Sequence, residues 1–317
     1  MRTRIALLFA LLPLATLGAT CKGNGRSDAP SPPVEAEVPP PNPAAEEAAP
    51  RPTITDIDGL DIGVIRPELR ADFFRVLNEN FCYCGCPRTI ASCLSARQDC
   101  TCVRCSERMA NFILEQYKNG LTTEEVELEL IDGFQEGYNG PKQEFDLTNR
   151  PSKGHATAKN VLVEFADFRC AHCKAAFAPL NQLIESDPDV RLVYFYYPLG
   201  AAGDGPGVLA SEAAEEARAQ GKFWELAELL FKYQHSLEEE NLVKYAEEAG
   251  LDVARFKSAL AKHIHRERVL ADKKIGQAVN VEATPTIFVN GRPFGLGRTL
   301  ENFKLRLEIE AERGRCD

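Results

Sequence analysis

The apolar positions of the C-terminal half alternate between strand-length runs and helical patterns. Residues 161–168 and 190–197 are almost continuously apolar over a short length, which is typical of buried strands. After the second run, apolar residues recur at helical spacing. Four segments show this pattern: 211–220, 223–233, 241–250 and a long helix that begins at Val253 and carries Phe256, Leu260 and Ile264.

The end of the chain returns to strands. A short apolar run over 285–290 ends at Asn290 and Gly291, a dipeptide that strongly favours a two-residue hairpin turn. A final helix is predicted over 300–311. With a further helix predicted from Cys170, the order of elements is strand, helix, strand, helical block, hairpin and helix. We therefore predict an α/β domain over residues 160–317.

A small helical module is predicted before this domain, over residues 53–140. Two helical patterns frame a run of cysteines, with Phe73, Phe74 and Leu77 on one side and Met109, Phe112, Ile113 and Tyr117 on the other. Gly120 ends the second helix, and Thr122 or Thr123 caps a third that carries Val126, Leu128 and Ile131. Residues 141–159 are polar and interrupted by proline and glycine, which predicts a linker between module and domain.

The N-terminal segment has the layout of an export signal. Arg2 and Arg4 precede an apolar run that is too short to span a membrane, so we predict a signal peptide over 1–21. Because Cys21 directly follows small residues, the segment resembles a bacterial lipoprotein signal, although Gly18 and Thr20 depart from the usual pattern. Cys21 is then a lipidation candidate that would anchor the protein to a membrane; ordinary cleavage, leaving a thiol, is the alternative. We expect the periplasm, where disulfides persist.

Composition limits the remaining choices. Residues 22–52 are rich in proline, alanine and glutamate and contain no aromatic residue, which predicts a disordered linker. The 317 residues as a whole are 44% hydrophobic and 26% charged, enough for a folded core. The formal net charge is -10 and no Lys/Arg-rich run occurs, which argues against a nucleic-acid partner.

The main candidate for chemistry is the segment Cys170-Ala171-His172-Cys173, where the first strand turns into a helix. A thiolate, rather than a thiol, attacks disulfides. At the helix start, Cys170 lies beside unpaired backbone N–H groups and the positive end of the helix dipole, which favour the thiolate. His172 adds to this stabilisation when it is protonated or donates a hydrogen bond. Cys173 follows one helical turn later, within reach of a disulfide, so we identify Cys170 as the exposed attacking thiol and Cys173 as the buried resolving thiol.

A structural disulfide or half of a zinc site is the alternative for this pair. Zinc would need a second pair of ligands, and residues 174–315 contain no cysteine. The strand-to-helix context therefore favours redox chemistry.

Residues 160–312, about half of the chain, resemble the DsbA-like branch of the thioredoxin superfamily. The match rests on four blocks in this order: VEFADFRCAHC at 163–173, GKFW at 221–224, GLD at 250–252 and VEATPTIFVNG at 281–291. The resemblance implies a thioredoxin-like fold with an inserted helical block. It also implies an enzyme, a protein thiol-disulfide oxidoreductase that needs no cofactor. One departure is Ala171, where the family commonly has proline. The two residues between the cysteines, Ala171 and His172, tune the redox potential of the pair.

The resemblance assigns roles to three further residues. Glu164 interrupts an apolar run in a predicted central strand, where an unpaired carboxylate is costly. In the family, a carboxyl at this place lies beneath the resolving thiol and passes its proton; a surface glutamate on an edge strand is the alternative. Pro285 corresponds to the family's cis-proline, which packs against the cysteine pair. The backbone of Thr284 would then pair with an extended client peptide.

The function expected from these residues is an exported oxidase that passes a disulfide to unfolded or thiol-containing exported proteins. A separate redox partner must then reset the cysteine pair. A disulfide isomerase or reductase is one alternative, and a non-catalytic periplasmic module that binds clients is another.

The seven cysteines of the N-terminal module admit three interpretations. They are Cys82, Cys84, Cys86, Cys93, Cys100, Cys102 and Cys105. In an oxidising compartment the default is a disulfide-stapled loop, and Cys316 would supply the eighth thiol. A metal site is the second interpretation, with candidate ligands Cys82, Cys84, Cys86, Cys102 and Cys105. The third is a second redox centre.

Two other pairs of residues carry less information. His263 and His265 lie two apart in the predicted long helix and would point to different faces, so we do not expect them to bind a metal. Phe223 and Trp224 are expected to be core or groove-lining aromatics.

Overall fold

The computed structural model describes residues 53–84, 86–200 and 205–312. The predicted signal peptide, Cys21, the predicted disordered linker and Cys316 lie outside the described residues. No helix of the described part is long and apolar enough to cross a membrane.

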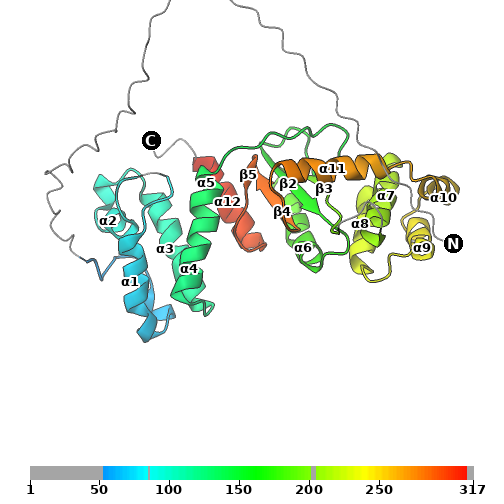
Figure 1. Ribbon diagram of the computed structural model, residues 1–317. Coiled ribbons are helices and arrows are strands. Elements are labelled where there is room, and N and C mark those ends of the chain that lie inside the picture. Colours follow the sequence, from blue (N-terminus) through cyan, green and yellow to red (C-terminus); the bar gives the residue numbers. More distant parts are fainter. Residues whose placement is uncertain (1–52, 85, 201–204, 313–317) are drawn as a thin grey trace, which may run out of the picture. The chain divides into compact units, whose positions relative to one another are not determined.

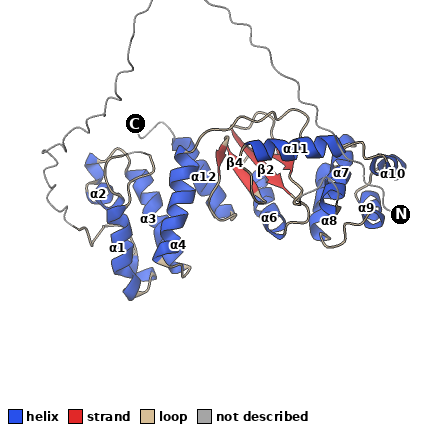
Figure 2. Cartoon of the chain, in the orientation of Figure 1, coloured by secondary structure: helices blue, strands red, loops and turns tan. Residues whose placement is uncertain are grey.

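A sheet of five strands forms the centre of the C-terminal domain, in the order β1-β3-β2-β4-β5 (Figure 2). The strands are β1 (Ser152–Gly154), β2 (Asn160–Ala166), β3 (Val190–Tyr196), β4 (Thr286–Val289) and β5 (Arg292–Pro293). β2 runs parallel to β3 and antiparallel to β4, so it is the central strand. The predicted hairpin is confirmed: Asn290 and Gly291, both at positive φ, join β4 to β5.

Alternate residues of β2 point to opposite faces of the sheet. Val163 and Phe165 pack with aromatic residues and with Ile275 of α11 (Arg266–Ala278). On the other face, Leu162 belongs to the same core as residues of α6 (Ala171–Ser186) and α12 (Leu300–Glu312). Figure 1 shows α6 and α11 on opposite sides of the strands. Glu164, in phase with Leu162, therefore points to the face that α6 covers.

The helical block between β3 and α11 contains α7 (Pro206–Ala219), α8 (Phe223–Lys232), α9 (Glu239–Glu248) and α10 (Val253–Ala261). The fold is thus thioredoxin-like with an inserted helical block, as the resemblance implied. As expected, Phe223 is buried in the core, and the indole of Trp224 donates a hydrogen bond to the Ser152 carbonyl at 3.0 Å.

The prediction of one long helix from Val253 is wrong, because the chain turns between α10 and α11. His263 has a positive φ, and Ile264 is exposed rather than on a buried face. The two histidines do not point apart. His263 Nδ1 lies 3.0 Å from Glu212 Oε2, and His265 Nε2 lies 2.6 Å from Glu216 Oε2, so both contact buried carboxylates of α7.

The cysteine-rich module is helical, as predicted. It contains α1 (Arg70–Glu79), α2 (Ile90–Ser95), α3 (Val103–Lys118), α4 (Thr123–Leu130), a π-helical segment (Ile131–Glu136) and α5 (Gly137–Asn139). Thr122 caps α4 through a reciprocal capping box with Glu125. In α4 the buried apolar residues are Val126 and Leu130, whereas Leu128 is exposed.

The segment 141–159, expected as a linker, is part of the domain. Its residues 152–154 form β1, which pairs with β3 at the edge of the sheet, and Phe145 packs on the aromatic face of the sheet. Arg108 of the module also pairs with Glu308 of α12 at 2.9 Å, and one apolar core contains residues of both parts. β1 was not predicted from the sequence, because a polar strand of only three residues shows too little hydrophobic pattern to be recognised.

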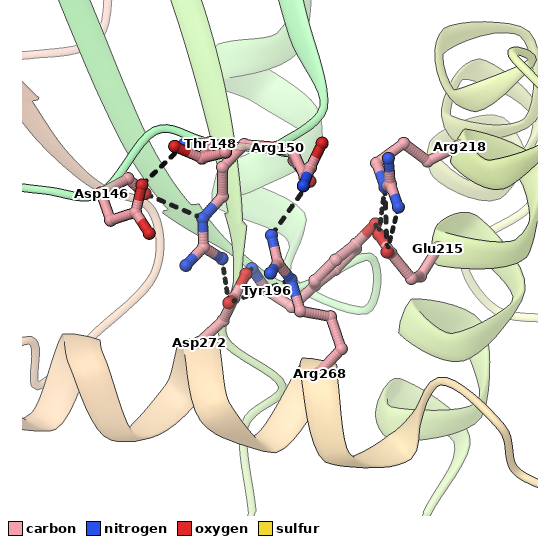
Figure 3. A network of polar contacts seen from close by, with 9 residues as sticks. Asp146, Thr148, Arg150, Tyr196, Glu215, Arg218, Arg268 and Asp272 are labelled. Carbon is pink, nitrogen blue, oxygen red and sulfur yellow. Dashed lines mark hydrogen bonds and ion pairs between the residues drawn. The ribbon is translucent and has the colours of Figure 1, made fainter.

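A buried polar network joins this segment to the sheet and to α11 (Figure 3). Asp272 of α11 is buried, pairs with Arg150, and accepts a hydrogen bond from the backbone N–H of Tyr196 at 3.2 Å. The Tyr196 hydroxyl donates in turn to Glu215 of α7 at 2.9 Å. Burial raises the pKa of Asp272, so removing Arg150 would leave a costly carboxylate in the core. The network thus connects β3 to both α11 and α7.

Candidate active site

Cys170 lies where the turn after β2 leads into α6. It is the N-cap residue of α6 and is partly exposed. Asp167 builds the turn, because its carboxylate accepts hydrogen bonds from the backbone N–H groups of Arg169 at 2.9 Å and Leu199 at 2.8 Å. The sequence analysis did not identify Asp167, although an aspartate two residues before an N–H donor is a common turn signal. The turn places the Cys170 sulfur at the N-terminal end of a helix of 16 residues.

Cys173 lies one turn further along α6 and is fully buried. Its surroundings are apolar and aromatic, and Phe168 and Tyr194 belong to the same core. Burial and the nearby charge of Glu164 raise the pKa of Cys173 well above its usual range. The pair thus consists of one accessible sulfur and one buried sulfur.

Glu164 lies in the central strand β2 and is 3% exposed. Burial raises the pKa of Glu164 from 4.5 to about 8, and the positive charge of Arg298 opposes this shift. A carboxyl with this pKa holds a proton at neutral pH. The location of Glu164 excludes the alternative of a surface residue on an edge strand, and it puts this carboxyl close enough to Cys173 to affect the pKa of that thiol.

Tyr194 of β3 is directly opposite Glu164 in the sheet. Its hydroxyl is buried and has no hydrogen-bond partner among the described residues, and burial raises the pKa of Tyr194 well above 10.0. The sequence analysis missed Tyr194 and Arg298. Tyr194 is brought to the site by strand register and Arg298 by a loop after β5, and neither stands in a recognisable motif.

The loop before β4 covers the Cys170 side of the site. The bond between Thr284 and Pro285 is cis, as the resemblance implied. The Cys170 thiol donates a hydrogen bond to the Thr284 carbonyl oxygen at 3.1 Å. Arg298 donates a hydrogen bond to the carbonyl of Pro285 at 3.0 Å. The guanidinium that opposes the pKa shift of Glu164 is therefore also bound to this loop.

The structure therefore brings together five of the six residues that the sequence analysis selected for catalysis and substrate binding: Cys170, Cys173, Glu164, Thr284 and Pro285. The sixth, His172, follows Cys170 in the first turn of α6 and is exposed.

The cysteines of the module form two groups. Cys93 and Cys100 form a disulfide, and Cys86 Sγ lies 3.9 Å from Cys93 Sγ. In the second group, the sulfurs of Cys82, Cys84 and Cys105 all lie within 4.8 Å of one another. Hydrogen bonding to Cys105 raises the pKa of Cys82 to about 12. The default interpretation of a disulfide-stapled loop thus holds for Cys93 and Cys100.

Comparison with known proteins locates the similarity in the C-terminal half. The family model described as thioredoxin matches residues 146–308. A curated relative, Na(+)/H(+) antiporter NhaA 3 of Salinispora tropica, is 37% identical over 140 residues, which are 44% of this chain and 21% of that protein. This chain therefore spans about a fifth of the length of that antiporter.

Solved structures match a similar share of the chain. BdbD from Bacillus subtilis in its oxidised form is 26% identical, with a TM-score of 0.47 over 54% of this chain and 97% of BdbD. The thiol-disulfide exchange protein alpha-DsbA2 from Wolbachia pipientis is 16% identical, with a TM-score of 0.46 over 59% of this chain and 94% of that protein.

Proposed function

This chain belongs to the thioredoxin family as a thiol-disulfide oxidoreductase, and we propose that it is a periplasmic oxidase that transfers a disulfide to client proteins. The observation that carries the proposal is the arrangement of the two sulfurs. Cys170 is accessible at the start of α6, and Cys173 is buried beside a protonated Glu164. One sulfur can be attacked by a protein, and the other can leave only toward the interior.

In the proposed reaction, a client thiolate attacks Cys170 in the Cys170–Cys173 disulfide. The bond between the two sulfurs breaks, a mixed disulfide forms at Cys170, and Cys173 leaves as a thiolate that takes the proton of Glu164. A second client thiolate then attacks the client sulfur of the mixed disulfide and releases the Cys170 thiolate. The client loses two electrons and gains a disulfide, while the cysteine pair gains the two electrons.

The N-terminus of α6 favours the direction of oxidation. A helix N-terminus stabilises a thiolate through its free N–H groups and its dipole, and Cys170 is the N-cap residue of α6. A disulfide whose reduced form is stabilised is a stronger oxidant. The pair must then be reoxidised by a partner that accepts two electrons.

The loop before β4 suits an unfolded client. In the reduced protein the Thr284 carbonyl accepts a hydrogen bond from the Cys170 thiol. An oxidised Cys170 has no S–H to donate, so this carbonyl becomes available to a backbone N–H of an extended peptide. A contact to the client backbone requires no particular client sequence, which fits an enzyme that acts on many exported proteins.

Export rests on separate observations. The predicted signal peptide over 1–21 directs the chain out of the cytoplasm, and Cys21 is the candidate for a lipid anchor. The Cys93–Cys100 disulfide supports an oxidising compartment. We therefore propose that the protein acts in the periplasm, with Cys21 as the candidate site of a membrane anchor.

The proposal is tested by mixing the oxidised protein with a reduced, unfolded protein that has a known set of disulfides. We expect one client disulfide for each Cys170–Cys173 disulfide consumed, measured by mass spectrometry after alkylation. The Cys170→Ser variant should form none. Rearrangement of wrong disulfides without net oxidation would favour an isomerase, and a client that stays soluble but reduced would favour a non-catalytic binding module.

A further inference from the structure

Four of the module's cysteines come together from two segments of the chain. Cys82 and Cys84 lie in the segment that follows α1, whereas Cys102 and Cys105 lie at the start of α3. The sulfurs of Cys82, Cys84 and Cys105 lie within 4.8 Å of one another, and Cys84 also contacts Cys102. We propose that Cys82, Cys84, Cys102 and Cys105 bind one zinc ion in a closed tetrahedral site.

The contacts among these sulfurs are shared rather than pairwise. A disulfide joins two sulfurs covalently at about 2.05 Å, as Cys93 and Cys100 are joined in the same module. Cys84, in contrast, contacts Cys82 at 3.1 Å and also contacts Cys105 and Cys102. Four thiolates around zinc lie about 3.8 Å apart, given Zn–S bonds of about 2.3 Å and tetrahedral angles. The sulfurs of Cys82, Cys84 and Cys105 therefore need shifts of only about 1 Å to enclose an ion, and Cys102 would complete the site from its contact with Cys84.

The order of the ligands along the chain also fits zinc. Zinc sites built from two cysteine pairs place roughly 15 to 20 residues between the pairs, as the interval from Cys84 to Cys102 does. The second pair has the spacing of two intervening residues that zinc sites favour. Cys86 does not belong to the set, because its sulfur lies beside the Cys93–Cys100 disulfide.

The start of α3 offers a favourable place for the negative charge of such a site. Cys102 is the N-cap residue of this helix of 16 residues, and Cys105 lies in its first turn. When four thiols bind Zn²⁺ they release four protons, and the resulting site carries two negative charges. The positive end of the helix dipole stabilises this charge, as it stabilises single thiolates at helix N-termini.

Burial indicates a structural role for the ion. Three of the four ligands are each at most 3% exposed: Cys82, Cys102 and Cys105. Four protein ligands complete the tetrahedral coordination of zinc and leave no open position for water or substrate. The ion would join the segment of Cys82 and Cys84 to the start of α3. It would also keep four thiols out of disulfide exchange in a protein whose other cysteine pair makes disulfides.

The test measures zinc in the full-length protein, purified without oxygen and dialysed against metal-free buffer. We expect about one zinc per chain, and less than about a tenth of that in Cys84→Ser and Cys105→Ser. The matched controls Cys86→Ser and Cys170→Ser/Cys173→Ser should keep the ion, which separates this site from the redox pair. Cobalt(II) chloride added to the zinc-free protein should give a thiolate-to-cobalt charge-transfer absorption.

Protein isolated from the periplasm in which these four cysteines are recovered as two disulfides, without zinc, would overturn the proposal. The same conclusion would follow from zinc that persists in both Cys84→Ser and Cys105→Ser. If these variants do not fold, the test is made on the unmodified protein. A chelator should then remove the zinc and lower Tm, and added zinc chloride should restore both; a Tm that is indifferent to zinc contradicts the site.

Discussion

The Cys173→Ser variant accumulates a mixed disulfide with clients at Cys170, and the Cys170→Ser variant forms none. Cys170 is partly exposed at the start of α6, so it reacts with a client disulfide even when its partner is missing. Cys173 is buried and is the one sulfur of the pair that can displace a client from Cys170, so without it the mixed disulfide persists with any client that has no second free thiol. Client oxidation should fall by a factor of at least about 10³ in either variant, because removal of a covalent participant eliminates the pathway.

Electrophoresis without reductant, followed by mass spectrometry of the trapped species, measures this result. The matched control is Cys86→Ser, which removes a partly buried thiol of the module. It should oxidise clients at the rate of the unmodified protein. A client attached to any cysteine other than Cys170 would show that the attacking sulfur has been misidentified.

Replacing Glu164 with glutamine should stabilise the protein at high pH and leave its stability unchanged at low pH. Burial raises the pKa of Glu164 from 4.5 to about 8 in the folded state, so folding opposes ionisation of this carboxyl. Below about pH 4.5 the carboxyl is protonated in both the folded and the unfolded state, so it does not lower the free energy of unfolding. As the pH rises above 4.5 the unfolded state ionises first, and the free energy of unfolding falls until about pH 8.

The size of the effect follows from the same shift. The pKa shift lowers the free energy of unfolding by on the order of 5 kcal/mol at pH 9, so the glutamine variant should be more stable there by up to that amount. Urea unfolding at pH 4 and at pH 9 measures the difference, in a Cys170→Ser/Cys173→Ser background so that no redox thiol titrates. Replacement of the exposed Glu282 by glutamine is the control and should show no such dependence on pH. An equal effect of Glu164→Gln at both pH values would contradict a buried, protonated carboxyl.

Local patterns sufficed for much of the domain. The runs that became β2 and β3 are almost continuously apolar, and Asn290 and Gly291 determine their own turn. Periodicity failed where the tertiary structure overrides it. The apolar spacing from Val253 continues into Ile264, yet the chain turns there, and His263 and His265 contact carboxylates of α7. No local pattern reports a partner on another helix.

The residues of the candidate active site also divide into those that a local pattern reveals and those that only the tertiary structure brings in. Cys170 and Cys173 were identifiable because their chemistry depends on one helical turn, and Glu164 because a carboxylate among apolar neighbours is unusual. Tyr194 was missed because only the pairing of β2 with β3 brings it opposite Glu164.

The cysteines of the module show a further limit of the sequence. Eight thiols allow 105 disulfide pairings, and composition does not choose among them. The packing of α2 and α3 separates Cys93 and Cys100 from the group that contains Cys82, Cys84 and Cys105.

The reduction potential of the Cys170/Cys173 pair tests the central claim most directly. It can be measured by equilibrating the protein with glutathione buffers and counting the two thiols, with Cys170→Ser as a control that should show no such couple. The account predicts a potential well above the value of about -270 mV of thioredoxin, toward the value of about -120 mV of a strong oxidant. A potential near -270 mV, or a couple that survives in Cys170→Ser, would contradict it.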